Sequence, residues 1–310
     1  EIMPSLVGSE MCIRDRSEMD YVLLTHGHLD HCGYLPLLVR HGFRGKILGT
    51  EPTLEIARII LEDSAKIQEE EAERANEEHY SKHDPALPLY TKEEAAFALK
   101  FFERIEEGET VVLSENCSAT FLYNGHIIGS TYIEMDLYGK RLVFSGDVGR
   151  QEDELLNPPK QPEWADYLFV ESTYGDRLQP EEDVEHILTE LVKETLQEKG
   201  TLIIPSFAVE RLQSLMYQLW NLYRKNRIPN IPIFVDSPMG NNVLEVFEEF
   251  PSWHKLTLEE YHNMCNHISI VSSYAETWET IDDPRPKIVI AGSGMVTGGR
   301  VLTYIKQLGD

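Results

Sequence analysis

The stretch His26-Gly27-His28-Leu29-Asp30-His31 decides the fold of this chain. It packs three imidazoles and a carboxylate into six residues, and its glycine lets the backbone turn tightly between two of them. Imidazole nitrogen and carboxylate oxygen suit Zn²⁺, and also Mn²⁺ or Fe²⁺. A lone histidine is usually a core or surface residue, whereas this spacing after an apolar strand is rare by chance. The stretch predicts a metal site whose ligands can divide between two ions.

The residues around this cluster follow an α/β pattern. Strands are predicted over 21–25, which ends at the cluster, and over 46–50. Helices are predicted over 36–43, over 53 to about 78 and, opening at the capping box Thr91-Lys92-Glu93-Glu94, over 91 to about 104. Further strands are predicted over 110–113, 119–123, 131–137, 141–145 and 167–170.

Two more candidate ligands follow predicted strand ends. His126 comes after the strand over 119–123, and Asp147 comes after the strand over 141–145. Each residue alone could be an ordinary turn residue. A metal ion that activates water needs about three protein ligands, and a two-metal site needs a bridge. Together with the first cluster, the two residues therefore make a coherent ligand set.

The second half of the chain alternates between helix and strand. Helices are predicted at about 180–199, 209–224, 240–250 and 298–308, and strands over 201–205, 233–236, 268–271 and 287–291. Such alternation is typical of a parallel, doubly wound sheet, so we expect a second domain. Residues 1–17 show neither pattern, and we interpret them as a non-native N-terminal segment.

Composition limits the classes of protein. The 310 residues are 42% hydrophobic, which is enough for one large or two ordinary domains. No apolar run approaches the ~20 residues of a membrane helix, no signal peptide is visible, and the four cysteines lie far apart, so we expect a cytoplasmic protein. The net charge of −25 is unlike that of most nucleic-acid binders, although metal ions would offset acidity at a site.

The cluster resembles the HxHxDH motif of the metallo-β-lactamase fold hydrolases. The resemblance implies that His26, His28 and His126 bind one zinc ion and that Asp30 and His31 bind the other. Asp147 matches the residue that bridges both ions. A water or hydroxide between the ions would then be the nucleophile.

Later segments resemble the β-CASP group within that family. They are Glu171-Ser172-Thr173-Tyr174-Gly175-Asp176, the stretch 205–211 (PSFAVER), Asp236-Ser237-Pro238-Met239, and Ser293-Gly294-Met295 with Gly298-Gly299-Arg300. From residue 21 onward the chain is similar to bacterial RNA-processing nucleases related to the eukaryotic pre-mRNA 3′-end cleavage endonuclease. The implied fold is a partial metallo-β-lactamase αββα sandwich over 18–174, with an inserted doubly wound α/β β-CASP domain over 175–310.

The implied function is a zinc-dependent ribonuclease, endo or 5′-exo, that hydrolyses single-stranded RNA with two Zn²⁺ per complete site. Asp30, Asp147 and Glu171 are the predicted catalytic residues; Glu171 could instead be a simple loop carboxylate. The predicted substrate-binding residues are Ser206, Arg211, Ser293 and Gly294, with structural roles as their alternative. Glycines after a buried strand and before a helix could cradle a phosphate.

One departure from the family matters. The family has two later histidines: one is a further zinc ligand, and the other is an acid that protonates the leaving oxygen. No stretch of this sequence matches the segments that carry them. We therefore expect a fragment truncated at both ends that is weakly active or inactive. The alternatives are a non-catalytic scaffold subunit and a metallo-hydrolase acting on DNA or on a small ester or thioester. The expected partner is RNA and not a membrane, and a homodimer is left open.

Overall fold

The computed structural model describes residues 16–178 and 183–309, so most of the segment 1–17 lies outside the described residues. The chain divides into two compact units. Within the described residues, unit 1 extends to Gln151 and includes Pro158–Glu171, and unit 2 comprises Glu152–Asn157 and the chain from Ser172 onward. In the described part of the chain, none of the helices combines the length and apolarity needed to span a bilayer.

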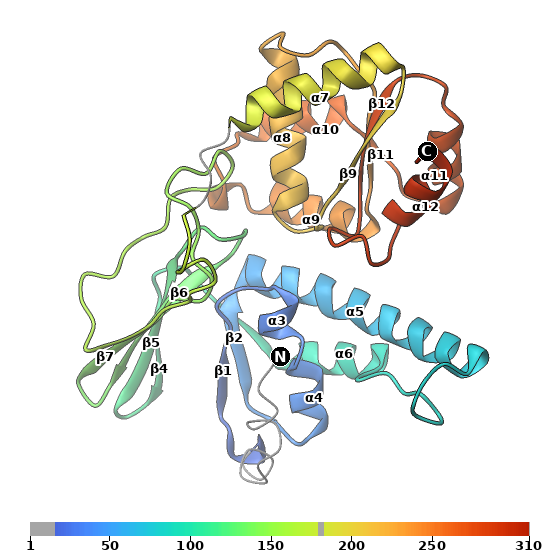
Figure 1. Cartoon of the computed structure of the whole chain (residues 1–310). Helices are drawn as coiled ribbons and strands as arrows, with labels where there is room; N and C mark the ends of the chain where they lie inside the picture. The colour runs from blue at the N-terminus through green and yellow to red at the C-terminus, as the bar shows by residue number, and fades with distance from the viewer. Residues whose placement is uncertain (1–15, 179–182, 310) are drawn as a thin grey trace. The chain divides into compact units, whose positions relative to one another are not determined.

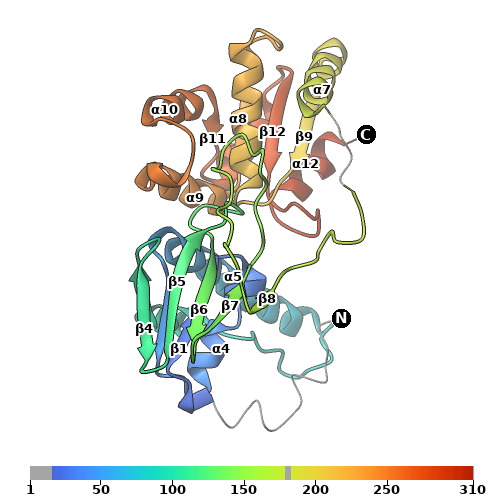
Figure 2. The ribbon, with the colours of Figure 1, turned by 90° about the vertical axis from the view of Figure 1, so that its left-hand side faces the viewer.

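Unit 1 is built on two sheets (Figures 1 and 2). The first sheet is parallel, with the order β1-β2-β3. The second has the order β4-β5-β6-β7-β8 and is antiparallel except for its last pair. The strands are β1 (Tyr21–Leu23), β2 (Lys46–Thr50), β3 (Phe102–Ile105), β4 (Thr110–Ser114), β5 (Cys117–Tyr123), β6 (Thr131–Leu137), β7 (Lys140–Phe144) and β8 (Tyr167–Phe169).

The core of unit 1 lies between these two sheets. Leu48 and Ile105 from the first sheet pack against Ala119, Phe121 and Ile133 from the second. Helices lie against the first sheet on its other side (Figure 1). They are α3 (Leu29–Cys32), α4 (Leu35–Arg40), α5 (Glu51–Glu78) and α6 (Lys92–Ala98), with short 3₁₀ turns η1 (Arg16–Glu18) and η2 (Leu99–Phe101). The layers are therefore helix, sheet and sheet, which is part of the αββα sandwich that the resemblance implies.

The helix predicted to run to residue 104 is wrong at its end. The capping box at Thr91 and Glu94 is present, but α6 ends at Ala98. The residues that follow η2 form β3, which pairs with β2 in parallel. Ile105 is 6% exposed in the core between the sheets, so tertiary pairing overrides the local helical pattern.

Unit 2 is a four-stranded parallel sheet with helices on both faces (Figure 1). The strand order is β11-β10-β12-β9, and all five residues of β12 are buried, as expected for a central strand. The strands are β9 (Thr201–Pro205), β10 (Ile233–Asp236), β11 (Ser269–Ile270) and β12 (Lys287–Ala291). The helices are α7 (Val184–Glu198), α8 (Arg211–Arg224), α9 (Pro238–Glu249), η3 (Pro251–Trp253), α10 (Leu258–His267), α11 (Tyr274–Asp282) and α12 (Val301–Leu308). The doubly wound architecture is confirmed; α10 and α11 were not foreseen.

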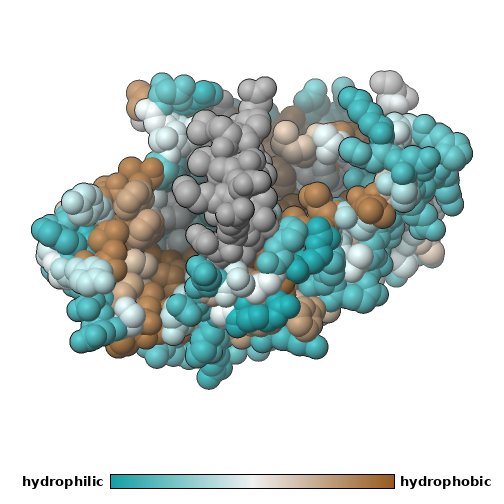
Figure 3. Space-filling view, turned by 90° about the horizontal axis from the view of Figure 1, so that it is seen from below, coloured by the Kyte–Doolittle hydropathy of each residue, from teal (hydrophilic) through white to brown (hydrophobic). Residues whose placement is uncertain are grey.

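Strand β8 is an unusual edge of the five-stranded sheet. Its residues Tyr167, Leu168 and Phe169, together with Val170, are each more than half exposed. Phe169 stacks on Phe144 of β7 with a centroid distance of 4.6 Å. Figure 3 shows a hydrophobic area on the side of unit 1 where Figure 1 places this sheet. Exposed apolar edges of this kind favour pairing with further polypeptide.

A buried histidine makes the stability of unit 2 depend on pH. His254 is 5% exposed; its Nε2 lies 2.9 Å from the carbonyl oxygen of Phe247, and its Nδ1 accepts a hydrogen bond from the Leu256 amide. Burial lowers the pKa of His254 below its ordinary value of 6.5. Because the unfolded chain then binds the proton more tightly, stability falls as pH drops from about 6.5 toward the lowered pKa.

We expect His254→Gln to flatten this dependence. His254 should contribute up to about 1.4 kcal/mol of lost unfolding free energy per pH unit within that window, and the variant should lack this contribution. Urea denaturation at pH 7.5 and pH 5 measures the difference. His262→Gln, at a half-exposed position, is the matched control and should follow the wild type. Parallel pH curves for the wild type and His254→Gln would contradict the assignment.

Candidate metal centre

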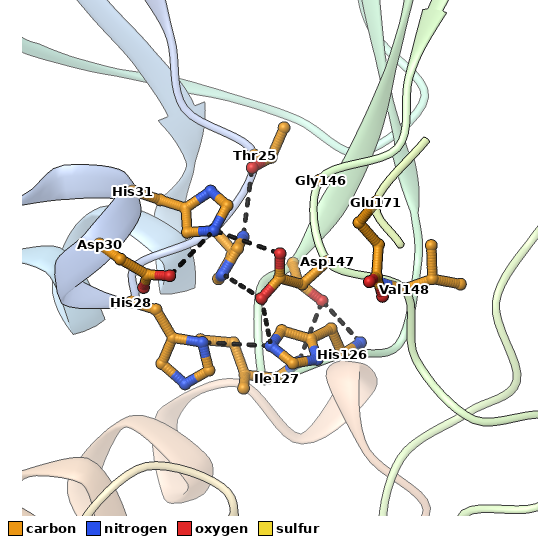
Figure 4. A network of polar contacts seen from close by, with 12 residues as sticks. Thr25, His28, Asp30, His31, His126, Ile127, Gly146, Asp147, Val148 and Glu171 are labelled. Carbon is orange, nitrogen blue, oxygen red and sulfur yellow. Dashed lines mark hydrogen bonds and ion pairs between the residues drawn. The ribbon is translucent and has the colours of Figure 1, made fainter. Parts of the chain in front are cut away.

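The first ligand group lies where β1 ends. The amide of Leu24 still bonds to Leu48 of β2, and the backbone then turns so that His26 is fully buried. His28 is the N-cap residue of the short helix α3, and Asp30 and His31 lie within that helix. The cluster thus runs from the end of β1 into the short helix α3, and the side chains of His28, Asp30 and His31 lie around a common centre (Figure 4).

His126 lies on the loop that joins β5 to β6. Gly125 and Gly129 have φ angles of 68° and 83°, which glycine adopts without strain. Thr50 and Thr53 both donate hydrogen bonds of 2.6 Å to the carbonyl oxygen of Gly129, so the first turn of α5 holds this loop. A Cβ at Gly129 would lie 2.4 Å from the Thr53 nitrogen, which leaves no room for a side chain.

Asp147 lies on the loop after β7. Gly146 before it has a φ of 55°, and a Cβ there would lie 2.9 Å from the side chain of Thr25. Thr25 also accepts a hydrogen bond of 2.8 Å from Thr131 of β6 through its carbonyl oxygen. The ends of β1, β5 and β7 therefore meet at one edge of unit 1, and all six predicted metal ligands come together there.

The side chain of Asp147 divides its two oxygens between two donor groups (Figure 4). Its Oδ2 lies 3.8 Å from His26 Nε2 and 3.4 Å from His126 Nε2, while His126 Nε2 lies 3.1 Å from His28 Nδ1. Its Oδ1 lies 3.2 Å from His31 Nε2, which is 3.5 Å from Asp30 Oδ2. One group is thus three imidazoles and a carboxylate oxygen, and the other is two carboxylates and one imidazole.

These residues fit a metal ion. Ligands about 2.0–2.1 Å from a tetrahedral ion lie about 3.3 Å apart, which is close to the observed donor separations. His26 Nε2 is buried and has no hydrogen-bond partner, whereas its Nδ1 lies 3.2 Å from Thr25 Oγ1. That arrangement leaves the Nε2 lone pair facing the other donors, as a metal ligand requires. The cluster therefore has the donor groups of a His/Asp metal-binding site.

Burial keeps the three imidazoles of the first group neutral. It lowers the pKa of His26 to about 2 and that of His28 to about 4, helped by neighbouring imidazoles, and it lowers the pKa of His126. Burial also raises the pKa of Asp147 from its ordinary value. Neutral imidazoles have free lone pairs, so three ligands of the first group need lose no proton to bind a cation near neutral pH.

Glu171 follows β8 and lies beside the Asp147 loop (Figure 4). Its carboxylate accepts a hydrogen bond of 3.3 Å from the amide of Val148, and its own amide donates to Ser145 Oγ at 3.1 Å. Glu171 belongs to neither donor group. The structure therefore places it next to the predicted metal ligands, where its carboxylate holds the backbone after Asp147.

The predicted substrate-binding residues lie in unit 2, and all but Arg211 follow the ends of its neighbouring strands β9 and β12. The buried Ser206 donates its amide hydrogen to Ala291 of β12, and a Cβ at Gly294 would touch the Phe207 ring at 2.9 Å. Ser293 lies in the same loop, and Arg211 is the exposed first residue of α8. Three of the four are thus close together, and their role in substrate binding stays a prediction.

Sequence reasoning gave no role to Asn124, which the structure places at the centre of the ligand loops. The residue is 2% exposed and bonds to both the His126 and the Asp147 loops. A buried amide at a strand end, immediately before a Gly-His pair, was the available signal. Ser130 was likewise missed, although its Oγ accepts the amide hydrogens of His126 and Ile127.

Comparison with known proteins agrees with this geometry. Residues 14–186 match the metallo-β-lactamase superfamily, and residues 212–310 match the β-CASP domain. The chain is 33% identical to Ribonuclease TTHA0252 of Thermus thermophilus, over 94% of this chain and 65% of that protein. It is 30% identical to Transcription termination factor FttA of Methanocaldococcus jannaschii, over 98% of this chain and 47% of that protein.

An RNase J-like protein of the same archaeon is 28% identical, over 96% of this chain and 65% of its own length. The chain therefore spans between 47% and 65% of the length of these three relatives. The match to the superfamily covers more than half of the chain and includes all six clustered ligands. The chain belongs to the metallo-β-lactamase superfamily and carries a β-CASP domain.

Proposed function

We propose that this protein is a zinc-dependent ribonuclease that hydrolyses phosphodiester bonds of single-stranded RNA. The observation that carries the proposal is the division of the two Asp147 oxygens between two donor groups. That arrangement is what a bridging ligand of a two-metal hydrolase requires. A relative at 33% identity is named a ribonuclease, which supports RNA as the substrate class.

The six clustered residues would bind two metal ions. His26, His28 and His126 would hold one ion with Asp147 Oδ2, and Asp30 and His31 would hold the other with Asp147 Oδ1. Three imidazoles in the first group favour Zn²⁺ over the harder Mg²⁺. Two such ions, when bound, would polarise a phosphoryl oxygen and lower the pKa of water. Glu171 keeps the Asp147 loop in place through the Val148 amide.

The experiment incubates the protein, expressed from its whole gene, with end-labelled single-stranded RNA and with DNA of the same sequence. RNA should be cleaved, and a chelator should lower the rate roughly 10²-fold or more because transition-state charge loses its stabilisation. Added Zn²⁺ should restore cleavage. Internal products would indicate an endonuclease, and mononucleotides released from one end would indicate an exonuclease.

A second candidate is a metallo-hydrolase of small esters or thioesters. The net charge of −25 favours it, because an acidic chain repels a polyanion. A thioester and a β-lactam therefore belong in the same assay. Metal-dependent turnover of either compound, with RNA left intact, would overturn the ribonuclease proposal and keep the metal centre.

A further inference from the structure

We propose that Asn124 is a positioning residue that sets the separation of the metal ligands His126 and Asp147, and thereby the metal affinity of the centre. The proposal rests on the metal centre described under the proposed function. It assigns a role to a residue outside the six clustered ligands, whose side-chain amide bonds to backbone groups.

The need for such a residue follows from the sheet order. The His126 loop follows β5 and the Asp147 loop follows β7, but β6 lies between these strands. No ladder of backbone hydrogen bonds therefore joins β5 directly to β7. Even so, His126 Nε2 and Asp147 Oδ2 lie only 3.4 Å apart. Contacts beyond the ends of the strands must hold the two loops at that distance.

The side chain of Asn124 makes these contacts. Its Nδ2 donates to the carbonyl oxygen of Ser145 at 2.9 Å and to that of Asp147 at 2.7 Å. Its Oδ1 accepts the amide hydrogen of His126 at 3.2 Å. One amide group thus bonds directly to the backbones of two metal ligands from different strand ends.

The orientation of this amide is determined by its partners. Two carbonyl oxygens need a donor, and one N–H group needs an acceptor, so exchanging the oxygen and nitrogen would lose all three bonds. The residue is 2% exposed, so water cannot easily replace them. The side-chain amide of asparagine therefore supplies the donor and the acceptor that these three backbone groups need.

Ser130 shapes the His126 loop, and a backbone bond of Asn124 adds to the link that its side chain makes with the Asp147 loop. Ser130 Oγ accepts the amide hydrogens of His126 and Ile127, which fixes the His126 loop alone. The backbone adds one link, from the Gly149 amide to the Asn124 carbonyl oxygen at 3.0 Å. A side-chain substitution leaves that backbone bond available, so the fold of unit 1 has a means to persist when the amide is removed.

The test compares metal binding by the wild type, Asn124→Ala and Asn124→Ser. Zn²⁺ and Co²⁺ affinities are measured by competition with a chelator, and the Co²⁺ absorption spectrum reports the coordination geometry. Loss of support for ligands typically weakens metal affinity about 10- to 100-fold, and we expect a weakening in that range with an altered Co²⁺ spectrum. The serine hydroxyl can donate to one carbonyl, so Asn124→Ser should lie between the wild type and Asn124→Ala.

Asn116→Ala is the matched control, because Asn116 is exposed in the turn between β4 and β5 of the same sheet. It should bind metal like the wild type. Circular dichroism identifies which variants fold, and if Asn124→Ala does not fold, Asn124→Ser decides. A folded variant with wild-type affinity and an unchanged Co²⁺ spectrum would overturn the proposal. A wild type that binds neither ion would overturn the metal centre itself, which is a separate result.

Discussion

Asp147→Asn should remove metal from both donor groups and abolish hydrolysis. Asp147 is the one residue that the two groups share, with a different oxygen facing each. The substitution keeps the size of the side chain but replaces one oxygen by an NH₂ group and removes the charge, so it cannot bridge two cations. Metal content measured by elemental analysis should fall from about two ions per chain to below one. The cleavage rate should fall roughly 10³-fold.

Asp136→Asn provides the control for this experiment. Asp136 is exposed near the far end of β6 and accepts the Gly139 amide hydrogen through Oδ1, which asparagine can also do. Asp136→Asn removes one negative charge from the same sheet, and this variant should keep the wild-type metal content and cleavage rate. Wild-type metal content in Asp147→Asn would show that the assignment of the bridge is wrong.

His26→Leu should have opposite effects in the metal-free and the metal-loaded protein. His26 is fully buried and its Nε2 has no hydrogen-bond partner, so without metal the ring carries an unsatisfied polar atom that costs about 1–3 kcal/mol. Leucine of similar size removes that cost, and the metal-free variant should be as stable as the wild type or more stable. With metal at 100 times its Kd, the wild type should gain about 2.7 kcal/mol, and the variant should gain less.

Urea denaturation with and without a chelator measures both effects. His254→Leu is the informative comparison, because His254 is also buried but both of its ring nitrogens have partners in the protein. That variant should be destabilised to the same extent with and without metal. A His26→Leu variant that is destabilised by several kcal/mol in the chelator, and still gains fully from metal, would contradict the ligand role.

The sequence allowed the fold and the clustered ligands to be predicted because their signals are local. His26 to His31 are close in the sequence, and His126 and Asp147 each follow an apolar strand. Parallel and antiparallel pairing then brings these strand ends to one edge of the sheets. The family, and with it the two-domain fold, is confirmed by the comparisons.

Other features depend on contacts between distant segments. Residues 102–105 form a strand because β2 offers them an edge, although the capping box before them indicates a helix. The part played by Asn124 depends on carbonyl oxygens more than twenty residues away. The sequence pattern does not indicate which backbone groups lack a hydrogen-bond partner. The role of a side chain that bonds to such groups can therefore be recognised only from the structure.

The positions of the ligands along the chain have a consequence for the lifetime of the protein. An ion held by His26 and Asp147 joins points more than one hundred residues apart in the sequence, and it does so within unit 1 alone. It therefore behaves as a reversible cross-link across a long loop, the kind of closure that opposes unfolding most in principle. In a cell short of the metal, more of the chain would have unit 1 open to proteases.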